Sequence, residues 1–198
     1  MSKSVFVDID TQFDFMHPEG HLYVPGAETL IPQLERLMQH ARTRGIPVVA
    51  SADAHAGDDP EFQQFPAHCV QGTAGQEKID VTHRADALVL PNQPADAALE
   101  GKSAFVLEKT VFDLFGNPNA ERVFASLAPQ QCYVFGVATD YCVRAAALGL
   151  RQRGYAVTVV SDAIRAVTAA GEAHTLDELT AAGIRLLGTD QVLTEAQA

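Results

Sequence analysis

Short, uninterrupted runs of apolar and β-branched residues are the feature that most limits how this chain can fold. A run of this kind, bounded by turn residues, predicts a strand that is buried on both faces. Such runs occupy residues 4–10, 47–52, 87–91, 104–109, 131–138, 156–161 and 184–188. Segments with apolar residues at helical spacing lie between them, at 27–44, 119–127, 140–153 and 172–182. This alternation predicts an α/β fold with three α/β/α layers, in which helices cover both faces of a mostly parallel central sheet.

Length and composition narrow the class of protein. The 198 residues fit a single domain spanning 1–198. The formal net charge of −11 argues against nucleic acid and anionic membranes as partners. No apolar run approaches the roughly 18 residues that span a bilayer, and the first residues lead directly into a strand pattern, so we expect no membrane segment and no signal peptide. The three cysteines are too few and too irregularly spaced for a disulfide framework, which favours the cytoplasm.

Four side chains with chemical potential lie at the ends of predicted strands. They are Asp10, Asp53, Lys109 and Cys142. In open parallel sheets, ligands bind outside the carboxyl ends of the strands. We therefore expect these four residues to meet at one edge of the sheet, despite their separation in the sequence.

The stretch Gly136–Val143 (GVATDYCV) joins a predicted strand to a predicted helix and places Cys142 in the first helical turn. The N–H groups and the positive dipole end of a helix N-terminus lower the pKa of a thiol, so Cys142 is a candidate nucleophile. Asp10 is the available base, and Lys109 is a cation that could hold it. The residues alone fit simpler roles equally well: a buried core thiol, a turn-capping carboxylate and a solvated strand end.

Residues 53–76 show no periodicity, and a loop of about 20 residues in a compact domain is usually functional or disordered. This loop contains Asp53, His55, Glu61 and His68. Two imidazoles and two carboxylates suit zinc, iron(II) or manganese. Asp53 and His55 point the same way because they are two residues apart at a strand end. The spacing alone is weakly specific, since aspartates and histidines are frequent in loops.

Four segments together resemble the cysteine hydrolase superfamily of nicotinamidases and isochorismatases, and most closely its metal-containing nicotinamidases. The segments are Asp10–Phe15 (DTQFDF), the metal-loop pair Asp53–His55 and Phe65–Gly75, the lysine strand end Glu108–Lys109, and the nucleophile turn Gly136–Val143. They follow the family's order and span almost the whole chain. The resemblance implies the family's Rossmann-like α/β/α fold.

The resemblance also implies roles for individual residues. It implies a catalytic triad of Asp10, Lys109 and Cys142. It implies a cis peptide bond between Val137 and Ala138, with the backbone N–H groups of Ala138 and Cys142 forming an oxyanion hole.

The same resemblance implies a divalent metal ion, with zinc as the first choice and iron or manganese as alternatives. The implied ligands are Asp53, His55, Glu61 and His68. Glu61 is chosen as the third ligand because it lies seven residues before His68. Asp58 and Asp59 compete with it for this position.

The implied reaction is hydrolysis of a small carboxamide through a thioester, with nicotinamide as the first candidate substrate and the metal positioning its ring nitrogen. Phe15, Phe65 and Tyr141 are expected to contact the substrate, and the two phenylalanines could sandwich a flat ring. Three departures weaken the assignment of nicotinamide. Phe65 stands where the family has a tryptophan, Tyr141 stands where nicotinamidases often have histidine, and residues 110–119 lack the usual nicotinamidase pattern.

Three alternatives to a nicotinamidase stay open. One is an amidase of the same family that acts on another small amide, and the second is an isochorismatase-like vinyl-ether hydrolase, which does not need the metal ligands. The third is a catalytically silent protein that binds a metal or a ligand. In each enzymatic interpretation the partner is a small molecule, and the resemblance implies a homo-oligomer.

Overall fold

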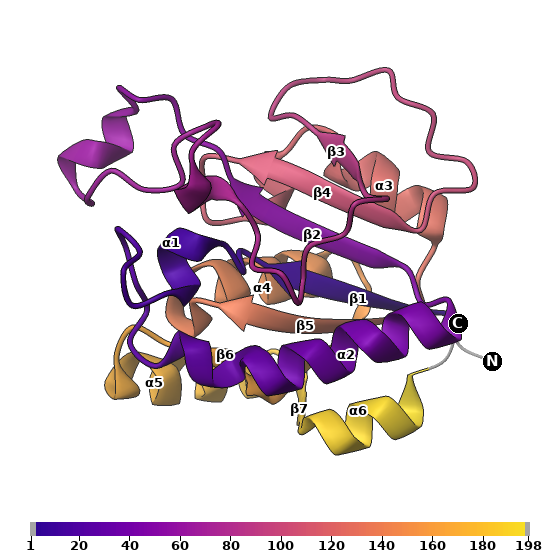
Figure 1. The fold of residues 1–198 in the computed structure, drawn as a ribbon. Helices are drawn as coiled ribbons and strands as arrows, with labels where there is room; N and C mark the ends of the chain where they lie inside the picture. The colour runs from indigo at the N-terminus through magenta and orange to yellow at the C-terminus, as the bar shows by residue number, and fades with distance from the viewer. Residues whose placement is uncertain (1–2, 197–198) are drawn as a thin grey trace.

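The computed structural model describes residues 3–196 and is built around one seven-stranded sheet (Figure 1). The order of the strands is β3-β4-β2-β1-β5-β6-β7, and every neighbouring pair is parallel. The strands are β1 (Ser4–Ile9), β2 (Val48–Asp53), β3 (Leu88–Leu90), β4 (Ala104–Lys109), β5 (Gln131–Val137), β6 (Ala156–Arg165) and β7 (Arg185–Leu187). The predicted parallel α/β architecture is confirmed.

Helices cover both faces of this sheet. The α-helices are α1 (Phe13–Met16), α2 (Ile31–Arg44), α3 (Ala120–Leu127), α4 (Arg144–Gln152), α5 (Ala169–Ala181) and α6 (Thr189–Glu195). Figure 1 shows α2 and α6 on one face and α3, α4 and α5 on the other, which gives the three predicted layers. No helix within residues 3–196 is long and apolar enough to cross a membrane.

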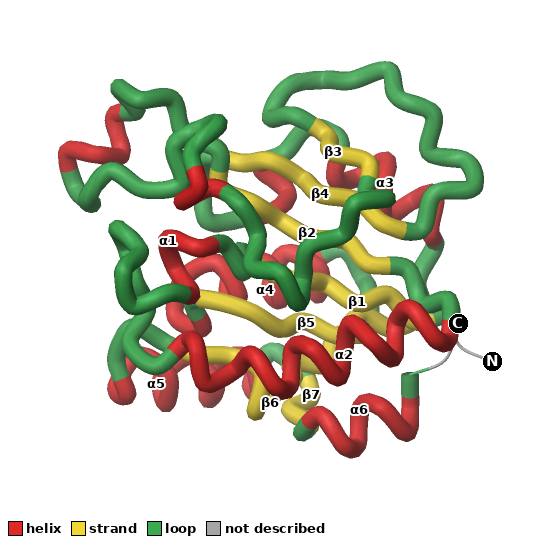
Figure 2. The backbone as a smooth tube through the Cα atoms, viewed as in Figure 1, coloured by secondary structure: helices red, strands yellow, loops and turns green. Residues whose placement is uncertain are grey.

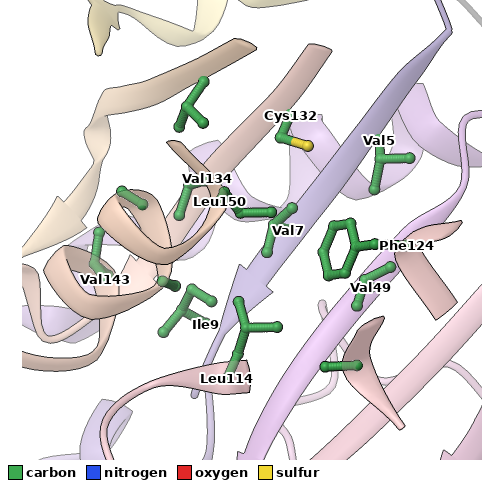
Figure 3. Close-up of a cluster of buried hydrophobic side chains, with 14 of the residues drawn as sticks. Val5, Val7, Ile9, Val49, Leu114, Phe124, Cys132, Val134, Val143 and Leu150 are labelled. Carbon is green, nitrogen blue, oxygen red and sulfur yellow. The ribbon is translucent and has the colours of Figure 1, made fainter. Parts of the chain in front are cut away.

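Strand β1 shows why its sequence is apolar without interruption. Val5, Val7 and Ile9 pack against the face that carries α3 and α4 (Figure 3), while Phe6 packs with α2 residues on the opposite face. Successive side chains of a strand point to opposite faces, so a strand with helices on both sides needs apolar residues at nearly every position.

Several predicted elements differ in detail from the structure. Strand β6 continues to Arg165 instead of ending at 161, and a register shift separates the two parts of its pairing with β5. Helix α5 begins at Ala169 rather than 172, because the Thr168 side chain accepts a hydrogen bond from the Gly171 N–H and caps the helix there. The loop 53–76 contains two short 3₁₀ helices, η2 (Pro60–Gln63) and η3 (Ala74–Gln76).

The topology locates the functional edge of the sheet. The chain leaves β1 through α2 on one face and leaves β5 through α4 on the other, so the adjacent strands β1 and β5 form the switch point where ligands bind in such folds. Gly136 of β5 allows the backbones of β5 and β1 to lie close together here. It has φ +116°, and a Cβ at this position would overlap the carbonyl group of Ile9. Figure 2 shows loops gathered beyond the carboxyl ends of the strands.

Candidate active site and metal centre

Strand register brings a buried lysine between two carboxylates. Asp53 and Lys109 are the last residues of β2 and β4 and lie opposite each other in the ladder, so their side chains emerge side by side. Lys109 Nζ lies 2.8 Å from Asp10 Oδ2 and 3.7 Å from Cys142 Sγ, and it also contacts Asp53 Oδ1. All four residues are buried. The structure therefore brings together the three residues predicted as the triad.

Asp10 is fixed both by its backbone and by a hydroxyl group. It follows β1 with φ +48°, and Ser51 Oγ donates a hydrogen bond of 2.7 Å to its Oδ1. Burial alone would lower the pKa of Lys109, but the charges of Asp10 and Asp53 outweigh burial and raise this pKa well above its usual value. Lys109 is therefore a permanent ammonium in this site.

Cys142 differs from the prediction in its local structure and its acidity. It lies in a π-helical turn, η5 (Thr139–Val143), and α4 begins only at Arg144. Burial raises the pKa of Cys142 well above its usual value; the charge of Lys109 lowers it, but the carboxylates of Asp10 and Asp53 raise it further. The prediction of a lowered thiol pKa was wrong, because burial and the two carboxylates outweigh the charge of Lys109.

The peptide bond between Val137 and Ala138 is cis, as the resemblance implied. It lies at the junction of β5 and the η5 turn, and both residues line the pocket next to Cys142. The turn is closed by two hydrogen bonds to the Ala138 carbonyl oxygen, from the N–H groups of Tyr141 and Val143, each at 3.1 Å. Cys142 therefore lies within a hydrogen-bonded turn that begins directly after the cis peptide bond.

Three of the four predicted metal ligands, Asp53, His55 and His68, form one compact group, and Glu61 joins it through His55. His55 Nε2 lies 3.8 Å from Asp53 Oδ2 and 3.9 Å from Glu61 Oε2, and His68 Nε2 lies 3.9 Å from Asp53 Oδ2. Ligand atoms bound at 2.0–2.1 Å around a tetrahedral zinc ion are separated by roughly 3.3–3.4 Å. Asp53, His55 and His68 are buried, and His55 Nε2 has no hydrogen-bond partner among the described residues. The donor set and its spacing fit a divalent cation.

Each of the two histidines is oriented by an oxygen atom next to its Nδ1 atom. His55 Nδ1 lies 3.0 Å from Asp59 Oδ2, and His68 Nδ1 lies 2.8 Å from the carbonyl oxygen of Pro66. When Nδ1 donates to these acceptors, Nε2 keeps its lone pair for a cation, which is the usual arrangement of metal-binding histidines.

The contacts of His55 also distinguish the three carboxylates that compete for the third ligand position. Glu61 faces Nε2 of His55, whereas Asp59 binds the opposite ring nitrogen. Asp58 is exposed. Burial lowers the pKa of His55, but the nearby carboxylates of Asp53, Asp59 and Glu61 together outweigh burial and raise this pKa to about 9. The cluster thus concentrates negative charge around one imidazole.

A pocket of about 130 Å³ connects the nucleophile to the metal cluster. Cys142, Val137 and Ala138 form one part of its wall, and Asp53, Glu61 and His68 form another. Its other lining residues are largely apolar or aromatic and include the three predicted substrate contacts: Phe15, Leu22, Tyr23, Val24, Phe65, Phe112, Tyr141 and Val167. Phe65, Phe112 and Tyr141 meet edge to face at ring-centroid distances of 5.3–6.5 Å.

Several site residues were missed by the sequence analysis. Phe112 belongs to the segment after Lys109 that shows no family pattern, and its position three residues beyond a functional strand end was the available signal. Ser51 lies two residues before Asp53 on the same strand, so period-2 alternation places it on the same side. Tyr23, Val24 and Val167 come from loops whose position only the tertiary structure shows.

The sequence matches the isochorismatase domain family over residues 4–191. The chain belongs to the isochorismatase family. Nicotinamidase from Escherichia coli (strain K12) is 28% identical to this isochorismatase-family hydrolase over 206 residues, which cover 90% of this chain and 91% of the relative.

Solved structures agree with this assignment. Pyrazinamidase of Pyrococcus horikoshii in complex with zinc aligns with a TM-score of 0.79 at 26% identity and covers 94% of this chain and 99% of its own. N-carbamoylsarcosine amidase from Thermoplasma acidophilum aligns with a TM-score of 0.76 at 26% identity and covers 95% of this chain and 97% of its own. Both share the fold of this isochorismatase-family hydrolase across nearly its full length.

Proposed function

We propose that this hydrolase cleaves a small, neutral aromatic carboxamide, with nicotinamide as the first candidate, to the carboxylate and ammonia. The observation that carries the proposal is the pocket, which places Cys142 and the metal cluster on the walls of one cavity lined by aromatic rings. A flat ring of this class can bring its carboxamide to the sulfur while a ring nitrogen faces the cluster. The similarity to proteins named nicotinamidase and pyrazinamidase supports the same class.

The charges around the pocket favour a neutral substrate over an anionic one. Among the described residues that line the pocket there is no lysine or arginine, while Asp53 and Glu61 both contribute carboxylates. A substrate carrying its own carboxylate would have only the proposed metal as a cation to replace its lost hydration, and the proposal assigns that position to a ring nitrogen. We therefore place an isochorismatase-like reaction, whose substrate is anionic, behind amide hydrolysis.

The resting thiol requires a base, because its pKa is raised by burial. In our proposal Asp10 accepts the thiol proton as Cys142 Sγ bonds to the amide carbon, and the ammonium of Lys109 stays within reach of both groups. Asp10 then gives the proton to the departing nitrogen as the C–N bond breaks, which releases ammonia and leaves a thioester. A water molecule adds to the thioester carbon while Asp10 takes its proton. The C–S bond then breaks, which releases the acid product, and the departing sulfur recovers the proton from Asp10.

The backbone N–H groups of Ala138 and Cys142 are the proposed oxyanion donors, since the η5 turn presents this backbone beside the sulfur. One such donor is typically worth about 2.7–4 kcal/mol in the transition state. Asp53, His55, Glu61 and His68 would hold a divalent cation, with zinc as the first candidate. A bound cation would supply positive charge and a Lewis-acid position for a ring nitrogen.

The test is a screen for ammonia release by purified, metal-loaded protein, with metal content measured on the same sample. The screen compares nicotinamide, pyrazinamide, benzamide, an aliphatic amide and an N-carbamoyl amino acid. We expect activity on the aromatic amides and little on the carboxylate-bearing substrate. Release from the aliphatic or carboxylate-bearing substrate alone would contradict the proposal, and an alkylation-resistant Cys142 without any turnover would support a silent binding protein.

A further inference from the structure

The buried side chain of Gln12 directs its hydrogen bonds at the backbone of two other segments. Its Oε1 accepts a hydrogen bond of 2.7 Å from the backbone N–H of Asp53, and its Nε2 donates bonds of 2.8 Å to the carbonyl oxygens of Asp53 and Gln76. The side chain is inaccessible to solvent. An amide that is buried with its hydrogen bonds made is a rigid connection, because any displacement leaves a polar group unpaired.

Gln12 acts as a substitute for a neighbouring strand at the end of β2. The paired residues of β1 and β2 run from Phe6–Val48 to Asp8–Ala50, and Asp53 lies three residues beyond the last pair. On its other side Asp53 pairs with Lys109 of β4. The Gln12 amide takes both the N–H and the C=O of Asp53, as the peptide group of an adjacent strand would.

The residue held in this way has a carboxylate that serves two sites. Oδ1 of Asp53 contacts the Lys109 ammonium, and Oδ2 lies 3.8–3.9 Å from the Nε2 atoms of His55 and His68. A rotation of the Asp53 backbone would move Oδ2 away from both imidazoles. The orientation of this backbone therefore decides whether the metal ligands converge.

The third hydrogen bond of Gln12 reaches the segment that follows the metal loop. Gln76 is the last residue of η3, and its side chain accepts a hydrogen bond from the Gly72 N–H. Gln12 also forms an antiparallel bridge with Lys78. The turn that carries Asp10 is thus connected to β2, which carries Asp53, and to the end of the loop 53–76.

We propose that Gln12 is a positioning residue that sets the orientation of Asp53 and thereby the affinity of the metal site. This inference rests on the metal site proposed above and is independent of the substrate. Gln12 lies two residues after Asp10, so one short turn holds the base and the backbone of a metal ligand.

The test compares Gln12→Glu with Asn117→Asp. Glutamate keeps the shape of Gln12 but presents an acceptor to two carbonyl oxygens, which removes both donated bonds. Asn117 is a matched control, because it is a buried amide that donates to the carbonyl oxygens of Leu90, Pro91 and Glu108 and touches no proposed ligand. Zn²⁺ affinity is measured by chelator competition, and the visible spectrum of bound Co²⁺ reports ligand geometry.

We expect Gln12→Glu to weaken Zn²⁺ binding by about 10- to 100-fold, the usual effect of losing a group that orients a ligand, and to change the Co²⁺ spectrum. Asn117→Asp should lose thermal stability but keep its Zn²⁺ affinity within about threefold of the wild type.

If Gln12→Glu does not fold, Gln12→Met, which is neutral and of similar length, takes its place. Equal Zn²⁺ affinity in the Gln12 variant and the wild type, or a wild type that binds neither Zn²⁺ nor Co²⁺, overturns the inference. Because no readout uses nicotinamide, failure of the proposed substrate leaves this result unchanged.

Discussion

The carboxylate of Asp53 contacts the ammonium of Lys109 with one oxygen and faces the imidazoles of the metal cluster with the other. Burial raises the pKa of Asp53, but Lys109 and His55 together outweigh burial and lower this pKa below its usual value, so the group is an anion that both neighbours share. The proposed catalytic groups and the proposed metal site are therefore one electrostatic unit rather than two adjacent sites.

Cys142→Ala should abolish ammonia release from the preferred amide, with a loss of more than about 10³-fold, because no other thiol faces the pocket among the described residues. Cys132→Ala is the matched control: Cys132 is also a buried free thiol, but it lies within β5 in the core. We expect the control to keep kcat/KM within about threefold. Equal losses in both variants, measured on protein whose fold is checked by circular dichroism, would contradict the role of Cys142.

Asp10→Asn should lower kcat by about 10²- to 10⁴-fold, the range expected when a general base is lost. The amide keeps the shape of Asp10 and can still accept the Ser51 hydrogen bond, so the effect should appear in kcat more than in stability. Steady-state kinetics and urea unfolding on the same preparation separate the two. Unchanged kcat in a folded variant would show that another group takes the thiol proton.

Phe112→Ala should raise KM for an aromatic amide by about 2- to 12-fold, equivalent to the 0.5–1.5 kcal/mol of an aromatic pair. Phe112 lines the pocket and is 42% exposed, whereas its neighbour Val111 is 51% exposed and does not line it. Val111→Ala is therefore the control and should leave KM unchanged. A similar rise in KM for a small aliphatic amide would show that Phe112 shapes the entrance and does not contact the ring.

The three carboxylates of the metal loop should rank by their positions around His55. Glu61→Gln should weaken Zn²⁺ binding most, because Glu61 faces Nε2. Asp59→Asn should weaken it by about 10- to 100-fold through the orientation of the ring, and the exposed Asp58→Asn should have no effect. Chelator competition gives the order, and a larger loss in Asp59→Asn than in Glu61→Gln would identify Asp59 as the ligand.

Asp14→Asn should destabilise the protein by about 2 kcal/mol at pH 7, the scale of hydrogen bonds to a charged group. Burial raises the pKa of Asp14, but its hydrogen bonds from the N–H groups of His21 and Cys69 lower it, and the net pKa is below its usual value. Because the folded-state pKa is lowered, this stabilisation is complete above the unfolded-state value of 3.8 and is lost as pH falls through the folded-state value.

Urea unfolding of the wild type and Asp14→Asn between pH 7 and pH 3 measures this dependence. The difference in unfolding free energy should be present between pH 7 and about pH 5 and should shrink below about pH 4. A difference that keeps its full size at pH 3 would contradict the assignment of an ionised Asp14. Gly75 packs directly against the Asp14 carboxylate, since a Cβ at Gly75 would overlap it.

The sequence by itself determined the parallel α/β architecture, because two-sided burial leaves a nearly continuous apolar run in strands such as β1 and β5. It also predicted that Asp10, Lys109 and Cys142 meet at one edge of the sheet, since functional side chains follow strands at their carboxyl ends. Local patterns carry this placement, whereas the roles expected of the three residues came from the family resemblance.

Only the tertiary structure decided how these residues behave and which others support them. The raised pKa of Cys142 depends on burial and on the carboxylates of Asp10 and Asp53, which lie far away in the sequence. The distinction between Glu61 and Asp59 depends on which nitrogen of His55 each one faces, and the bonds of Gln12 to Asp53 join residues 41 positions apart. Such relationships arise from chain packing and leave no periodic trace in the sequence.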